Sequence, residues 1–127
     1  MRFVSTRIHG VADYGLGIVL MASPWLFGFA TGGPAQWVPI VVGAGVLVMA
    51  VFTLNETGLF RVLPMDFHLG VDFWAGALLV VSPWLFNFAD VVFLPHLVLG
   101  LVEIGTSLTT RKTSSVQHGD PYAGRER

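Results

Sequence analysis

Four apolar stretches dominate this 127-residue chain and limit the folds that it can adopt. They cover roughly residues 9–29, 36–54, 67–88 and 91–109. Each is close to the length of about 20 helical residues that crosses the hydrocarbon core of a bilayer. Charged residues make up only 12% of the chain, whereas a soluble domain has about 25%. We therefore expect an all-α, polytopic membrane four-helix bundle.

The basic residues predict the orientation of this bundle. They fall before the first stretch, between the second and third, and after the fourth: Arg2, Arg7, Arg61, Arg111, Lys112, Arg125 and Arg127. The two remaining connections, around residues 30–36 and 89–91, contain none. Because basic loops stay on the cytoplasmic side, we expect a multi-pass protein of the cell (inner, cytoplasmic) membrane with both termini in the cytoplasm.

Two segments of the chain are nearly the same. Residues 9–30 and 68–89 align without a gap, and eleven of the 22 positions are identical. The similarity predicts two parallel repeats of a helical hairpin, about residues 7–55 and 66–110, related by a pseudo-two-fold axis along the membrane normal. Ser5 and Asp66 are the expected N-caps of the two first helices. Residues 1–110 then form one transmembrane domain, and the polar residues 111–127 a flexible cytoplasmic tail.

Each of the similar segments contains a Ser-Pro-Trp motif. The six residues are Ser23, Pro24, Trp25, Ser82, Pro83 and Trp84. Proline removes a backbone donor and kinks or ends a helix, and a neighbouring serine hydroxyl can satisfy the carbonyl that is freed. Tryptophan suits the membrane interface. We interpret the motif as a helix-breaking and interfacial element, not as a catalytic one.

The segments "ASPWLFGF" and "VSPWLFNF", each in the first helix of a two-helix unit, resemble the SPW-repeat family of small prokaryotic membrane proteins. The resemblance covers nearly the whole chain except the tail. It implies a four-helix integral membrane protein with an internal duplication. It implies no activity, because the family brings none that is assigned.

Ionisable residues inside the apolar stretches are the candidate functional residues: His9, Asp13, His68, Asp72 and Glu103. A charged side chain at the centre of a membrane helix costs about 2.5–3.5 kcal/mol on insertion scales, so such residues usually face the protein interior. A histidine and an aspartate four residues apart lie on one face of a helix. We expect the five residues to form one polar cluster in the cytoplasmic half of the bundle.

Three functions fit such a cluster. The first is structural, in which the histidines and aspartates satisfy each other in a scaffold or accessory subunit without catalytic activity. The alternative is a transporter of protons, cations or a small molecule. A further alternative is a redox subunit with haem or metal at His9 and His68, since imidazole is a common metal ligand. The chain has no nucleophile–base pair, phosphate loop or nucleotide fingerprint, so we expect no catalytic residue. It lacks cysteine and the HExxH and CxxCH motifs, so no metal or other cofactor is predicted apart from this further alternative.

The expected partners follow from the same features. Four helices with 15 glycines make a thin bundle, and the lipid bilayer would surround most of it. We expect a second copy of the chain or another membrane protein to associate with it. We expect no nucleic-acid partner.

Overall fold

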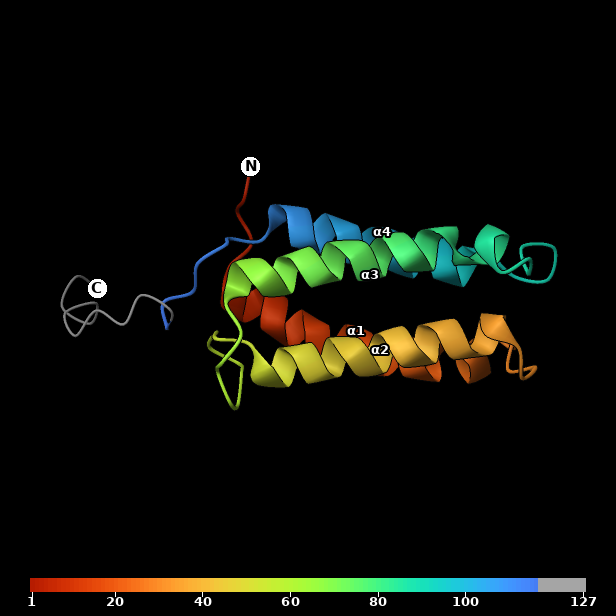
Figure 1. Cartoon of the computed structure of the whole chain (residues 1–127), viewed down its shortest axis with the longest axis horizontal. Coiled ribbons are helices and arrows are strands. Elements are labelled where there is room, and N and C mark those ends of the chain that lie inside the picture. Colours follow the sequence, from red (N-terminus) through yellow and green to blue (C-terminus); the bar gives the residue numbers. More distant parts are fainter. Residues whose placement is uncertain (117–127) are drawn as a thin grey trace.

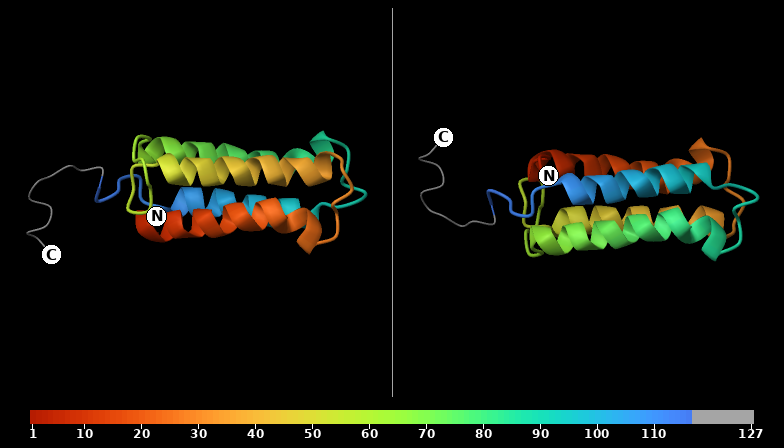
Figure 2. Two further views of the ribbon diagram at one scale, coloured as in Figure 1. Left: turned by 90° about the horizontal axis from the view of Figure 1, so that it is seen from below. Right: turned by 90° about the horizontal axis from the view of Figure 1, so that it is seen from above.

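The computed structural model describes residues 1–116, which form four helices. These are α1 (Thr6–Leu26), α2 (Pro34–Phe52), α3 (Met65–Leu85) and α4 (Leu94–Thr109). Helices α1 and α2 form one antiparallel hairpin and α3 and α4 another, and the two hairpins lie side by side as a bundle (Figures 1 and 2). In the described part, isolated bridges are the only β pairing. The expected all-α architecture with four helices is confirmed.

The connections divide between the two ends of the bundle. The N-terminus, the α2–α3 loop and the residues that follow α4 lie at one end, and the α1–α2 and α3–α4 loops lie at the other (Figure 1). At the first end, the backbone of Val4 pairs with that of Thr110, and Thr53 pairs with Leu63. The chain segments that enter α1 and α3 are thus bonded to the segments that leave α4 and α2.

The two first helices begin differently. Ser5 is the N-cap of α1, and its hydroxyl accepts a hydrogen bond from the Ile8 amide at 3.2 Å, as the sequence predicts. The N-cap of α3 is Pro64, so the expectation for Asp66 is wrong. The helix begins two residues earlier than expected and places Asp66 in its first turn. A carboxylate there is favoured by the positive end of the helix dipole.

Helices α1 and α3 both end just after their prolines, about three residues before the expected positions. Gly28 has a positive φ of 75°, and the residue before Phe88 has one of 58°. The Phe29 amide donates to the Pro24 carbonyl at 2.8 Å, and the Phe88 amide donates to the Pro83 carbonyl at 2.7 Å. A left-handed residue followed by this six-to-one bond is the Schellman C-cap. The shared ending of the two segments therefore terminates both helices.

The serine of each motif replaces the backbone hydrogen bond that the proline cannot donate. Pro24 has no N–H to donate to the carbonyl of Leu20, its partner four residues back. The Ser23 hydroxyl donates to that carbonyl instead, at 2.7 Å. In α3, the Ser82 hydroxyl donates to the Leu79 carbonyl at 2.8 Å. Both serines are fully buried, so each bond forms where water could not replace it.

Glycines let the two helices of each hairpin approach closely. A Cβ at Gly43 would lie 2.7 Å from the carbonyl oxygen of Gly17, and a Cβ at Gly100 would lie 2.7 Å from that of Gly76. Such separations are shorter than a carbon and an oxygen tolerate, so larger residues would push the helices apart. Between the hairpins, Leu20 packs with Leu79 in the main apolar cluster.

Two of the four expected spans are found by length and composition. Helices α2 and α3 are long and apolar enough to cross a membrane, whereas α4 is apolar but shorter. Helix α1 has 21 residues and is not among the candidates, because Arg7, His9 and Asp13 lower its hydropathy.

Candidate functional site

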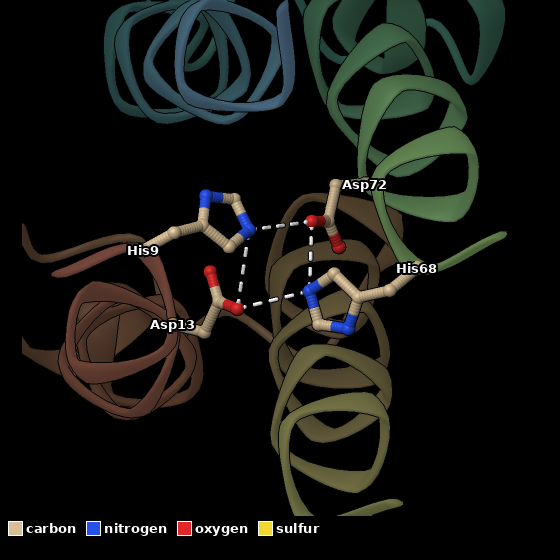
Figure 3. Close-up of side chains that lie close together, drawn as sticks. All are labelled: His9, Asp13, His68 and Asp72. Atoms are coloured by element: carbon tan, nitrogen blue, oxygen red, sulfur yellow. Dashed lines mark hydrogen bonds and ion pairs between the residues drawn. The ribbon is translucent and has the colours of Figure 1, made fainter. Parts of the chain in front are cut away.

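Four of the five expected residues meet between α1 and α3. His9 and Asp13 belong to α1, and His68 and Asp72 to α3. We call these four residues the quartet. Each is at most 2% exposed, and their side chains point toward one another (Figure 3). The sequence places a histidine and an aspartate on one face of each helix, and the packing of the hairpins turns the two faces together.

The polar atoms of the quartet alternate around a ring. The Nε2 atom of His9 lies 3.0 Å from Oδ2 of Asp72 and 3.3 Å from Oδ2 of Asp13. The Nε2 atom of His68 lies 2.9 Å from the same two oxygens. One nitrogen or oxygen atom from each residue lies within 4.8 Å of those of the other three. Four groups thus converge on one point (Figure 3).

Two threonines fix the orientation of the imidazoles. Thr53 follows α2 and its hydroxyl contacts Nδ1 of His68, while Thr110 follows α4 and its hydroxyl lies 2.9 Å from Nδ1 of His9. Each hydroxyl also donates to the carbonyl four residues earlier in its own chain. Because a hydroxyl has one proton, it must accept from the imidazole. Both Nδ1 atoms are therefore protonated, and both Nε2 atoms face the ring.

The quartet and its threonines connect all four helices. Thr53 and Thr110 extend from α2 and α4, and the quartet residues come from α1 and α3. Neither threonine is among the site residues predicted from the sequence. The signal that could have found them is their spacing of 57 residues, which Gly43 and Gly100 share.

The α2–α3 loop covers this end of the bundle. Asn55 is fully buried, and its side-chain oxygen accepts from the backbone amides of Thr57 and Gly58. A Cβ at Gly10 would collide with the hydroxyl of Thr57, so the loop rests directly on α1 beside His9. This cover explains why the quartet is buried so near the ends of its helices.

Residues that follow α4 add to the cover. The buried Ser114 donates its hydroxyl to the Leu54 carbonyl at 2.6 Å. The Ser115 hydroxyl donates to Glu56 at 2.8 Å, and Thr6 donates to the same carboxylate at 2.6 Å. The expected tail, residues 111–127, therefore begins in contact with the loop, and residues 117–127 lie outside the described residues.

The Glu56 carboxylate lies outside the four helices and carries a shifted pKa. Partial burial by itself raises the pKa of this group. The hydrogen bonds from Thr6 and Ser115 favour the charged form and outweigh the burial, so the pKa of Glu56 is lower than its ordinary value.

Glu103 lies beside the quartet without joining its hydrogen bonds. A Cβ at Gly76 would lie 3.0 Å from the Cβ of Glu103, so this side chain starts against α3, one turn beyond Asp72. It is 1% exposed, and neither of its carboxyl oxygens has a hydrogen-bond partner among the described residues. Its electrostatic interactions extend to Asp72, Asp13 and His68.

His96 forms a second buried polar contact, at the opposite end of the bundle. Its Nε2 atom donates to the Ala35 carbonyl at 2.8 Å. Pro39 lies four residues after Ala35 and cannot supply the helical bond to that carbonyl. The rings of Phe29 and Phe88 flank the imidazole at 5.1 and 4.9 Å. This role of His96 was not predicted from the sequence, although a proline within α2 indicates that one backbone carbonyl of that helix needs another donor.

The Ser-Pro-Trp residues lie away from the quartet. Ser23, Pro24, Ser82 and Pro83 are buried in the last turns of α1 and α3, whereas Trp25 and Trp84 are 64% and 58% exposed. The serines and prolines shape the helix ends as described above. The tryptophans project from the bundle surface.

The family of the chain follows from comparison with known proteins. A model of the SPW repeat domain matches residues 7–110, which include both motifs and the whole quartet. The chain therefore belongs to the SPW repeat family. No curated protein matches it, and no solved structure matches it.

Proposed function

We propose that this SPW repeat protein is a small integral membrane protein with four spans and a structural role, as a scaffold or accessory subunit. One observation carries the proposal: large apolar side chains are exposed on all four helices, while the polar quartet is buried between them. The exposed fraction is 61% for Val11, 65% for Val41, 71% for Trp74 and 52% for Val98, one from each helix. Large apolar surfaces mark contact with a membrane or a partner.

The buried side chains of the bundle are also consistent with a membrane protein. Among the described residues, more polar than apolar side chains are buried, and they include the whole quartet and Glu103. In a water-soluble protein, aspartate and glutamate are almost never fully buried unless they are paired. A surrounding bilayer removes the preference for an apolar interior, since lipid tails are as apolar as leucine.

The lengths of the helices fit a bilayer. Helices α1 and α3 have 21 residues each and α2 has 19, which correspond to about 28–31 Å at about 1.5 Å per residue. The hydrocarbon core is about 30 Å thick. Helix α4 has 16 residues and spans about 24 Å, a mismatch that local thinning of the bilayer accommodates.

Repeated contacts support a tandem duplication of one hairpin. The close approach of Gly17 to Gly43 has its counterpart in Gly76 and Gly100. The serine bonds near the ends of α1 and α3 also correspond, as do the two threonine–histidine contacts. The first helices are offset by 59 residues and the second helices by 57.

The structural role rests on the network around the quartet. Asp72 accepts from His9 and Asp13 accepts from His68, and each of these bonds joins α1 to α3, and therefore one hairpin to the other. The threonines connect α2 and α4 to the same network. A membrane offers no water to replace these bonds, so they fix how the hairpins pair.

Introduced cysteines test the membrane topology, because the natural chain has none to interfere. Thr31 and Asp90 lie in the two loops of one end, and Leu59 lies in the loop of the other end; all three are exposed. In intact cells we expect an impermeant thiol reagent to label T31C and D90C but not L59C. Positive-inside orientation requires this, since Arg61 and Arg111 share the end of Leu59. Equal labelling of all three, or release of the chain by alkaline carbonate, would refute the proposal.

A membrane partner is part of the scaffold proposal. We expect a second copy or another membrane protein to cover part of the apolar exterior. Crosslinking in native membranes, followed by electrophoresis, should show a discrete adduct larger than the 13.8 kDa chain. Monomer alone, both in crosslinked membranes and in mild detergent, would contradict this part.

A specific observation favours a second function, proton transfer. The Glu103 carboxyl is buried without a hydrogen-bond partner in the part of the chain that the structure describes, and its side chain starts one turn beyond Asp72. Acidic residues of this kind serve as relay groups in pumps and transporters. Reconstituted protein with Glu103→Gln should then lose proton flux while it keeps its helical content. Wild-type vesicles that show no flux above protein-free vesicles would exclude this function.

A further inference from the structure

We propose that the quartet binds one divalent transition-metal ion of the zinc type. Its ligands are the Nε2 atoms of His9 and His68 and one carboxylate oxygen each from Asp13 and Asp72. This inference goes beyond the scaffold role, and it stands whether or not the chain conducts protons. It assigns a bound ion to the group of residues that joins the two hairpins.

The distances between the four ligand atoms suit a central ion. Neighbouring nitrogen and oxygen atoms around the ring are separated by 2.9–3.3 Å, and no two of the four ligand atoms are more than 4.8 Å apart. A point midway between two atoms 4.8 Å apart is about 2.4 Å from each, slightly longer than the zinc–nitrogen and zinc–oxygen bonds of about 2.0–2.2 Å. A small inward shift of the side chains brings all four into bonding range.

Ordinary ion pairs explain the arrangement less well. Each Nε2 atom can carry one proton, yet each faces two carboxylate oxygens at similar distances. Asp13 and Asp72 both present a single oxygen, Oδ2, to both histidines. Within residues 1–116, the other oxygen of Asp72 is buried without a hydrogen-bond partner, although a carboxylate in a hydrogen-bonded pair can use both oxygens. Four groups that aim at one point form a coordination geometry.

The threonines supply the outer support that metal-binding histidines require. Thr53 and Thr110 accept the Nδ1 protons of His68 and His9, as their own bonds to backbone carbonyls dictate. A bound ion would take the place of the protons between Nε2 and the carboxylates, so that the Nε2 lone pair of each neutral imidazole is directed at the ion. Metal-ligating histidines almost always donate their other N–H to such a partner.

The charge and the chemistry of the ligands select the ion. Two carboxylates and two neutral imidazoles have a net charge of −2, so a divalent cation makes the buried centre neutral. Imidazole suits zinc and its transition-metal neighbours. Calcium is disfavoured because it requires six to eight oxygen ligands. The absence of cysteine also leaves no thiolate site for a soft monovalent ion.

Metal titration of the purified full-length protein tests the proposal. The chain is extracted in mild detergent, treated with a chelator, and titrated with Zn²⁺ in the presence of excess Mg²⁺. We expect one zinc per chain by elemental analysis and calorimetry, and none in His68→Gln. His96→Gln is the matched control, because His96 is equally buried but outside the quartet, and it should keep one zinc. Thr53→Val should weaken binding about 10–100-fold through the loss of outer support.

The wild-type protein provides a test that does not depend on the folding of any variant. X-ray absorption at the zinc edge should show four nitrogen or oxygen neighbours with the outer-shell signal of two imidazoles. A folded, monodisperse wild-type protein that binds no zinc above the buffer blank would overturn the proposal. So would a zinc spectrum without imidazole, or an equal loss of zinc in His68→Gln and His96→Gln.

Discussion

Replacing Ser23 with alanine should destabilise the fold, because Pro24 cannot supply the hydrogen bond that the serine hydroxyl makes. The Leu20 carbonyl would lose its donor, because Pro24 has no N–H and the fully buried site admits no water. A buried group without a partner costs about 1–3 kcal/mol, and single hydrogen bonds in membrane bundles average about 0.6 and reach about 1.7 kcal/mol. We therefore expect Ser23→Ala to lower the free energy of unfolding by about 1 kcal/mol.

Ser107 provides the matched control for this experiment. It is 2% exposed, and its hydroxyl donates to the Ile104 carbonyl at 2.8 Å, which is the same geometry as in the motif. The residue that follows it is Leu108 and not proline, so the helix supplies its own N–H to that carbonyl. Ser107→Ala should therefore change the stability by much less than Ser23→Ala.

A double-mutant cycle isolates the interaction. Pro24→Ala restores an N–H that can bond to Leu20, so Ser23→Ala should cost almost nothing in that background, with a coupling of about 1 kcal/mol. The measurement is reversible unfolding by SDS in mixed micelles, followed by far-ultraviolet circular dichroism. The reasoning is refuted if Ser23→Ala costs the same with and without Pro24, or no more than Ser107→Ala.

Three further predictions use the same unfolding measurement. Gly100→Ala should cost about 1–3 kcal/mol through overpacking, because its Cβ would lie 2.7 Å from a backbone carbonyl, whereas Gly105→Ala, which meets nothing within 4 Å, should be harmless. His96→Leu should destabilise more than His96→Gln, since only glutamine can still donate to the Ala35 carbonyl. The lowered pKa of Glu56 stabilises the fold above the ordinary value of 4.5, and this contribution should disappear as the pH falls through the lower folded pKa; in Glu56→Gln that part of the acid sensitivity should be absent.

The helices could be predicted from the sequence because the patterns that specify them lie within short segments of the chain. Apolar runs separated by polar or glycine-containing connections predict the helices. The spacing of four residues between His9 and Asp13 predicts a shared face. The serine next to Pro24 predicts the bond to the freed carbonyl, because both partners lie within one helical turn. Each of these arguments requires the geometry of a single helix and nothing more.

The rest of the site depends on how the hairpins meet, which local signals do not encode. The contact of each histidine with the aspartate of the other hairpin is decided by the register between α1 and α3. The approach of Thr53 to His68 depends on where α2 ends relative to the start of α3. Glu103 lies against Gly76, one turn beyond Asp72, but the sequence cannot tell whether its carboxyl reaches the quartet. His96 was missed because its partner carbonyl belongs to the other hairpin.

The arrangement of the quartet also makes the pairing of the hairpins specific. Within α1 alone, His9 and Asp13 lie 3.3 Å apart, while His9 and Asp72 of the other hairpin lie 3.0 Å apart. A single hairpin would leave each histidine and aspartate with one partner, at 3.3 Å in α1 and at 2.9 Å in α3. Only the complete pair of hairpins gives every Nε2 atom two oxygens. The ring of four groups thus requires both halves of the chain, and it would penalise any register of α1 against α3 in which a buried charge faced lipid or an uncharged surface.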